Sequence, residues 1–256
     1  MNWQTFVALL ARDARVARRN FVRVVVMNLL QPLLFVFVFG VVMTRSGLTA
    51  GAYRSLLLPG IIAISMVMSG IQAVAMPLIA EFQFTREIED RLLAPIDVTW
   101  VAVEKIIAGM LQAMVAGLVV VPAGWLMMRA GLGLSFGAPL TFLVVVLLVA
   151  LFSAAGGLLL GCSVGQTEIG LMFSLVLAPM IFFGCAYYPW SALASFPILQ
   201  KVVLVNPLVY ASEGLRGTLV PQYPHLPMVI VIAAMALVDV FLVAAGLRRF
   251  QKKAVS

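Results

Sequence analysis

The chain has 256 residues, of which 63% are hydrophobic and only 11% are charged, and its formal net charge is +7. A soluble domain with a polar exterior does not have this composition, so an integral membrane protein is predicted. The basic residues lie mainly beside apolar runs, where anionic lipid attracts them, and no nucleic-acid partner is therefore predicted.

The first 23 residues predict an amphipathic helix lying in the membrane interface. Apolar side chains recur at helical spacing from Trp3 to Phe21, while arginines from Arg12 to Arg23 follow another face. The alternative is that these arginines only fix the orientation of the chain. The apolar run that follows begins late and lacks an obvious small-residue cleavage site, so it is interpreted as a retained span rather than a signal peptide.

Six apolar runs approach or exceed the length needed to cross a bilayer, which takes about 20 helical residues. They lie at 24–43, 56–80, 101–128, 139–164, 169–186 and 228–247. The predicted fold class is therefore all-α integral membrane, with six transmembrane helices and both termini on the same side.

The basic residues predict that both termini are cytoplasmic, because Lys and Arg are enriched in cytoplasmic flanks. With the N-terminus inside, the larger group of basic residues is cytoplasmic: Arg12, Arg15, Arg18, Arg19, Arg23, Arg86, Arg91, Lys105, Arg248, Arg249, Lys252 and Lys253. The smaller group falls outside: Arg45, Arg54, Arg129, Lys201 and Arg216.

The stretch 81–97, EFQFTREIEDRLLAPID, contrasts with the basic chain because it holds five acids and two bases. Acids gain nothing from an anionic leaflet, so these side chains are expected to face the cytosol or another protein. Thr85 is a candidate helix cap, and Leu92 and Leu93 are candidate anchors of a short helix in a partner's groove. The alternative is an ordinary solvated loop.

Prolines divide the region 187–227 into pieces too short to span a membrane. Its apolar pieces predict re-entrant or interfacial helices packed against the bundle. Glu213 and Arg216 are spaced to pair on one helical face, either as a structural pair or as part of an outer gate. The aromatic residues of this region fit an interfacial belt better than a sugar-stacking site: Tyr187, Tyr188, Trp190 and Tyr210.

Few polar residues fall within the predicted spans. Asp239 is an acid deep in the sixth run, where it is either functional or protonated and paired at a helix interface. Gln72 and Gln112 predict hydrogen bonds between helices. Gly157, Gly161 and Gly165 repeat every four residues on one face and predict close approach of a neighbouring helix, either within the subunit or at a dimer contact.

The sequence contains no G-x-x-x-x-G-K-[ST] phosphate loop, so ATP used in transport has to be hydrolysed on another chain. One His and two separated cysteines, Cys162 and Cys185, form no zinc or Cys-His pattern, and no catalytic or metal-binding residue is predicted. The two cysteines are predicted to be buried free thiols because they lie near opposite ends of the membrane.

Three segments resemble one family. Residues 86–98, REIEDRLLAPIDV, resemble the cytoplasmic segment of ABC-2 type transporter permeases, in which charges lead into a Leu-Leu-x-x-Pro-like sequence before the third span. Residues 184–189, GCAYYP, and 206–217, NPLVYASEGLRG, resemble the aromatic-Pro and Asn-Pro elements on either side of the family's outer segment. The Tyr-Tyr-Pro and Asn-Pro-Leu wording is also similar to nodulation-factor exporter permeases.

The resemblance implies one ABC-2 type transmembrane domain over residues 1–256, with an interfacial helix at 1–23. It implies that a cytoplasmic segment at 81–99 couples the permease to its ATPase through Arg86, Glu87, Glu89, Asp90, Arg91, Leu92 and Leu93. It also implies an extracytoplasmic re-entrant segment at 187–227, whose candidate gate residues are Tyr188, Pro189, Asn206, Pro207, Glu213 and Arg216.

The resemblance further implies a homodimer in the inner membrane with two copies of a separate ATPase, which would bind ATP and Mg. The expected function is export of an amphipathic, lipid-linked glycoconjugate or hydrophobic drug-like cargo. One alternative is an ion-coupled secondary transporter that uses Asp239 as its proton site. A second alternative is a membrane scaffold that moves no cargo.

Overall fold

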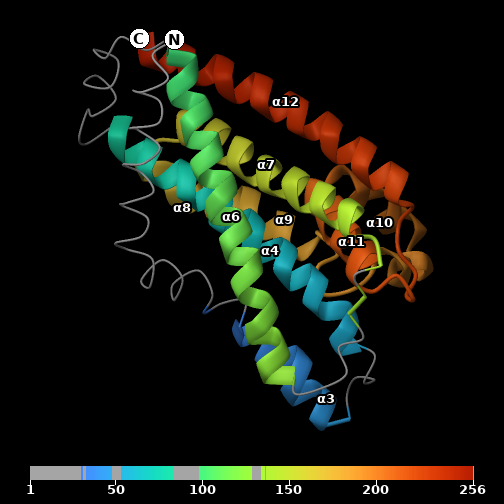
Figure 1. Ribbon diagram of the computed structural model, residues 1–256. Coiled ribbons are helices and arrows are strands. Elements are labelled where there is room, and N and C mark those ends of the chain that lie inside the picture. Colours follow the sequence, from blue (N-terminus) through green and yellow to red (C-terminus); the bar gives the residue numbers. More distant parts are fainter. Residues whose placement is uncertain are drawn as a thin grey trace.

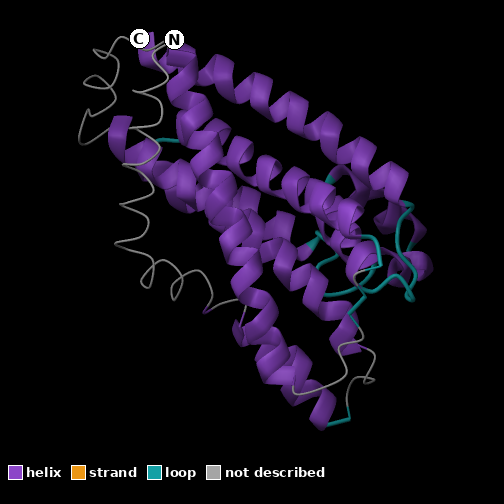
Figure 2. Ribbon diagram, viewed as in Figure 1, coloured by secondary structure: helices purple, strands orange, loops and turns teal. Residues whose placement is uncertain are grey.

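The computed structural model is a bundle of helices (Figure 1). It describes residue 30 and residues 33–47, 53–82, 98–128, 134–135 and 137–255. Within those residues every regular element is helical and no strand occurs (Figure 2). The predicted interfacial helix at 1–23 and the predicted coupling residues from Arg86 to Leu93 lie outside the described residues.

Four helices are long and apolar enough to cross a membrane. They are α4 (Tyr53–Ala80), α6 (Val98–Met128), α7 (Pro139–Ser163) and α12 (Met228–Val255). These helices coincide with the second, third, fourth and sixth apolar runs. α12 extends past its apolar run because residues 248–253 are mostly Arg and Lys, which are good helix formers at a helix C-terminus.

The other two runs form shorter helices in the described residues. The first is described from Leu33 and includes the π-helical turn η1 (Val36–Val42) and α3 (Met43–Arg45). The fifth forms one helix over Ile169–Phe182, which consists of α8 (Ile169–Leu171), the π-helical η4 (Met172–Leu177) and α9 (Ala178–Phe182), and the 3-10 turn η3 (Gln166–Glu168) precedes it. Four of the six predicted spans are thus present at spanning length in the described part of the chain.

The fifth run is a single helix over Ile169–Phe182 with a π-helical middle, and it ends four residues before the predicted limit of 186. Pro179 lies near the start of α9, where its missing N–H removes one bond of the regular ladder and favours the wider π-helical turns before it. The Ser174 hydroxyl donates to the Gly170 carbonyl at 2.9 Å within the widened turn. The helix ends at Phe182, and the turn that follows leads directly into residues 187–227.

α4 is the central helix. Its apolar window is 72% buried, whereas that of α12 is 17% buried, and α4 contacts η1, α6, α7 and α11. Figure 1 shows α12 along one edge of the bundle, beside α7. The outward face of α12 is therefore the kind of apolar surface that lipid covers.

Glycines allow α7 to approach α4 closely. A Cβ on Gly157 would lie 2.8 Å from the carbonyl oxygen of Ile71, and one on Gly161 would lie 3.0 Å from the Cα of Ala75. The first distance is shorter than real side chains tolerate against backbone, and the second is tighter than nine in ten real Cβ contacts. The predicted close packing at these two glycines is confirmed, and it occurs within one subunit.

Residues 187–227 form short helices gathered at one end of the bundle, beside the N-terminal ends of α4 and α12 (Figure 1). They are the 3-10 turn η5 (Trp190–Ser195), α10 (Pro197–Val202), the 3-10 turn η6 (Val203–Val205) and α11 (Pro207–Leu219). Prolines precede or begin three of them, as expected of a residue that lacks an N–H. The prediction of pieces too short to span is confirmed. This end is called the α11 end below.

Candidate functional site

A buried ion pair lies at the centre of the α11 end. Glu213 and Arg216 on α11 are both fully buried, and the Arg216 Nη1 donates to the Glu213 Oε1. Their spacing places them one turn apart on the same face, so the predicted pairing is confirmed. Two charges removed from water are tolerated only when their remaining donors and acceptors are also bonded.

The guanidinium of Arg216 makes those further bonds to backbone carbonyls. Its Nε donates to Leu56 in the first turn of α4 at 3.3 Å, and its Nη2 donates to Cys185 at 3.0 Å. Cys185 has a φ of 51°, a left-handed conformation that is costly for a residue with a side chain. Arg216 therefore joins α11 to the central helix and holds the strained turn after α9.

The carboxylate of Glu213 bonds to two backbone N–H groups far apart in sequence. Its Oε1 accepts from Trp190 at 2.9 Å, and its Oε2 accepts from Leu226 at 3.0 Å. Trp190 begins the run of short helices, and Leu226 lies two residues before the start of α12. The name hub is used below for Glu213, Arg216 and their bonded backbone groups, which tie together both ends of the segment, α4 and the turn after α9.

The Asn-Pro pair begins α11. The Asn206 Oδ1 accepts from the backbone N–H of Leu208 at 3.0 Å as an N-cap, and Pro207 occupies the first helical position. The Asn206 Nδ2 donates to the Met180 carbonyl in α9 at 2.7 Å. One side chain thus starts α11 and fixes it to the fifth apolar run.

The aromatic-Pro element has a related position. The Tyr188 hydroxyl donates to the Phe182 carbonyl at 3.0 Å, across the turn after α9. Pro189 is the N-cap of η5, and its extended ψ of 150° turns the chain into that helix. Tyr188, Pro189, Asn206 and Pro207 therefore lie beside the starts of η5 and α11, and the sequence motifs mark the points where these short helices begin.

The opposite end of the bundle holds the two helix ends that flank the predicted coupling segment, namely the C-terminal end of α4 with Glu81 and Phe82 and the N-terminal end of α6. These two helix ends are called the stems below. Glu81 ends the α4 side and Lys105 lies in the second turn of α6, and their Oε1 and Nζ atoms are 2.7 Å apart with both side chains buried. The ion pair fixes the two stems relative to each other. The charge count of the segment pointed to Glu81, but it did not reveal Lys105 as its partner.

The C-terminal turns of α12 contact both stems. The Gln251 Nε2 donates to the Thr99 Oγ1 at the start of α6 at 2.9 Å. The Phe250 and Phe82 rings meet edge to face with centroids 5.9 Å apart, and the Lys253 Nζ lies 4.7 Å from the Phe82 centroid. No local sequence pattern predicts these contacts, because they join residues more than a hundred positions apart.

The predicted intramembrane polar residues lie on three different helices. Asp239 on α12 is 2% exposed, and its carboxylate oxygens have no hydrogen-bond partner among the described residues. Gln72 on α4 and Gln112 on α6 are half-buried. The described residues include no group of three His, Cys, Asp or Glu side chains that could hold a metal, and Cys162 and Cys185 are buried free thiols, as predicted.

These features define a class: a multi-pass helical membrane protein with one end closed by short helices and the other leading into a charged segment. Residues 4–220 match the model of the ABC-2 type transporter family. The chain therefore belongs to the ABC-2 type transporter family, and it is a transport permease.

Curated relatives agree with this assignment. The chain is 26% identical over 218 residues to the inner membrane transport permease YadH of Escherichia coli K12, covering 84% of this chain and 82% of the relative. The YadH permease of Shigella flexneri matches to the same extent. The apolar helices and these homologues support a multi-pass protein of the inner membrane, and permeases of this family generally pair with an ATPase subunit.

Proposed function

We propose that the chain is the membrane subunit of an ATP-driven exporter. In this proposal two copies form a homodimer, and two copies of a separate ATPase bind ATP and Mg on the cytoplasmic side. Both termini and segment 81–99 face the cytoplasm, and segment 187–227 faces outward. The cargo is amphipathic, either a lipid-linked glycoconjugate or a hydrophobic drug-like molecule.

The observation that carries the proposal is that side-chain bonds join α4, α6 and α12 to one another beside segment 81–99. The Glu81–Lys105 pair joins α4 to α6, and the Gln251–Thr99 bond joins α12 to the start of α6. A displacement of segment 81–99 therefore moves α4, α6 and α12 together rather than bending one stem. Such shared motion is what closure of a partner ATPase needs in order to reach the spans.

The central helix offers a route to the other end of the bundle. α4 extends from Tyr53 at the α11 end to Ala80, next to Glu81. The backbone carbonyl of Leu56 in its first turn accepts a hydrogen bond from Arg216. A tilt of α4 would therefore act on the hub through the Leu56 bond, and the hub also holds both ends of segment 187–227. In this mechanism the hub is the outer latch, and Tyr188, Pro189, Asn206 and Pro207 are the hinge points around it.

The proposal is tested by expressing the chain together with its neighbouring genes, purifying the permease and asking whether an ATPase co-purifies. We expect the ATPase to co-purify and its hydrolysis to drive cargo efflux from vesicles. Efflux that continues after the ATPase is inactivated would contradict the proposal, as would a permease that binds no ATPase.

Asp239 favours one rival function. A carboxylic acid buried in a span without a hydrogen-bond partner is a candidate proton carrier. An ion-coupled transporter would move cargo in response to a proton gradient without any ATPase, and Asp239→Asn would abolish that movement. An ATP-driven exporter would retain ATP-dependent transport in the same variant.

A further inference from the structure

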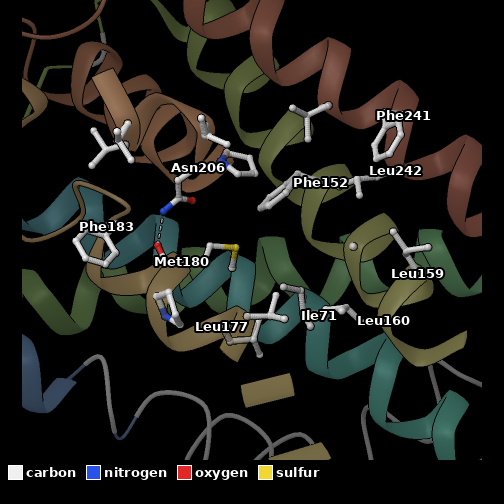
Figure 3. Close-up of a pocket in the computed structure, with 18 of the residues that line it drawn as sticks. Ile71, Phe152, Leu159, Leu160, Leu177, Met180, Phe183, Asn206, Phe241 and Leu242 are labelled. Atoms are coloured by element: carbon white, nitrogen blue, oxygen red, sulfur yellow. Dashed lines mark hydrogen bonds between the residues drawn. The ribbon is translucent and has the colours of Figure 1, made fainter. Parts of the chain in front are cut away.

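A cavity of about 650 Å³ lies on one side of the bundle, within the usual size range of ligand pockets. Its walls come from α7, η4 and α9, the η6–α11 junction and α12, with Ile71 of α4 contributing from the central helix. Figure 3 shows Phe152, Leu160, Leu177, Phe241 and Leu242 around the hollow. None of the residues assigned above to coupling lines it.

The described lining is almost wholly apolar. Asn206 is the one polar side chain among the described lining residues, and its amide oxygen and nitrogen are already bonded to Leu208 and Met180 (Figure 3). None of the described lining residues is charged. A sugar, a phosphate or a charged headgroup would lose its hydration there without replacement bonds, so the chemistry that fits is hydrocarbon.

The rim of the cavity is apolar and exposed. Val176, Val205 and Phe241 on three of its walls are 45%, 87% and 67% exposed. In a membrane-embedded permease, a rim of this kind is in contact with the bilayer rather than with water. Entry is therefore sideways from the lipid, and no polar passage has to be crossed.

We propose that this cavity binds one acyl chain of a membrane phospholipid. The site is independent of ATP-driven export, because it requires only that the chain lies in a membrane. A bound acyl chain would fill the space between α7, α9 and α12 and support the η6–α11 junction. The helices that form the cavity would then shift during transport around a lipid that stays bound to the permease.

Gly156 provides a direct way to fill the site. A Cβ on Gly156 would meet nothing closer than the Leu242 Cδ1 at 4.0 Å, so a larger side chain can extend into the cavity without striking backbone. Gly170, in α8, also has nothing within 4 Å of a built Cβ but does not line the cavity. Gly156→Phe is therefore the test variant and Gly170→Phe its matched control.

The experiment uses the full chain in nanodiscs of phosphatidylethanolamine and phosphatidylglycerol with a trace of phosphatidylethanolamine that carries a diazirine on one acyl chain. Surrounding lipid is removed by a detergent wash before illumination, and cross-linked peptides are mapped by mass spectrometry. We expect labelling near Phe152 and Phe241 in the wild type and in Gly170→Phe. We expect about tenfold less in Gly156→Phe, because loss of contact with a few methylene groups is worth that much in affinity.

A second variant distinguishes a filled cavity from a misfolded protein. Val176→Trp fills the cavity from the η4 wall, so loss of labelling in both variants with unchanged thermal unfolding supports the site. Equal labelling of the wild type and a folded Gly156→Phe would overturn the proposal. It would also be overturned if the wild-type cavity were labelled only by an added alkyl glycoside that carries the same diazirine and not by the phospholipid.

Discussion

Arg216 and Glu213 are the residues on which the α11 end depends most. Each is fully buried, and between them they bond to backbone groups of Leu56, Cys185, Trp190 and Leu226. Removal of one partner leaves the other charge buried without compensation, which costs about 3–5 kcal/mol. The pair is thus a structural requirement whether or not it also acts as a latch.

Arg216→Met is expected to destabilise the protein by about 3–5 kcal/mol, because the Glu213 carboxylate stays buried without its cation. The double variant Glu213→Gln/Arg216→Met is expected to recover part of that loss. The measurement is the unfolding free energy in denaturant titrations of the purified permease. Lys201→Met is the matched control, since Lys201 is exposed in α10, and a loss of equal size in that variant would contradict the account.

Substitutions of Asn206 separate its two contributions to the unfolding free energy, which are the N-cap of α11 and the hydrogen bond to α9. Asn206→Ala removes the N-cap of α11 and the bond to Met180, so we expect a loss of about 1–2 kcal/mol. Asn206→Asp keeps the capping oxygen but cannot donate to the Met180 carbonyl. Its loss in the same titration measures the bond to α9 alone, and a variant series in which Ala and wild type unfold alike would refute the capping role.

At the scale of elements, the contact between α4 and α7 sets the spacing of the bundle. Gly157 and Gly161 were recognised from their spacing because a four-residue repeat of glycine lies on one helix face. The central position of α4 could not be recognised in this way, since all four long helices have similarly apolar sequences. Which apolar helix is buried depends on contacts made across the whole chain.

Gly157→Ala is expected to destabilise the bundle by about 1–3 kcal/mol, because the added methyl would press on the Ile71 carbonyl and force the two helices apart. Gly170→Ala adds the same methyl where nothing lies within 4 Å and is expected to be neutral or slightly stabilising. Thermal unfolding followed by circular dichroism compares the two. Equal midpoints for both variants would show that the close approach is not limiting.

The fifth apolar run shows the limit of hydropathy at this scale. Hydropathy predicts one helix over 169–186, and the structure has one helix over Ile169–Phe182, with a π-helical middle at η4 and an end four residues earlier than predicted. The bond from Asn206 to Met180, which holds the last turns of this helix, comes from a distant motif. Long-range hydrogen bonds of this kind leave no local pattern.

At the scale of the whole molecule, α4 connects the hub at the α11 end with the Glu81–Lys105 pair at the opposite end of the bundle. The membrane class, four of the spans and the family were all predictable from the sequence, because each depends on composition, run length or a local motif. The contacts of α12 with both stems were not predictable, since Gln251 and Thr99 carry no mark of partnership. The cavity between α7, α9 and α12 was also missed, because its lining residues are ordinary apolar side chains.

The central claim is that an ATPase drives this permease through segment 81–99. The most direct measurement is the amount of ATPase that co-purifies with Glu87→Lys, compared with Glu168→Lys, a matched charge reversal on an acid outside the segment. We expect binding or coupled transport to fall by about tenfold in Glu87→Lys, because like charges at an interface are strongly unfavourable, and to be unchanged in Glu168→Lys. Normal ATPase binding and normal ATP-driven efflux in the variant reversed at Glu87, Glu89 and Asp90 together would contradict the claim.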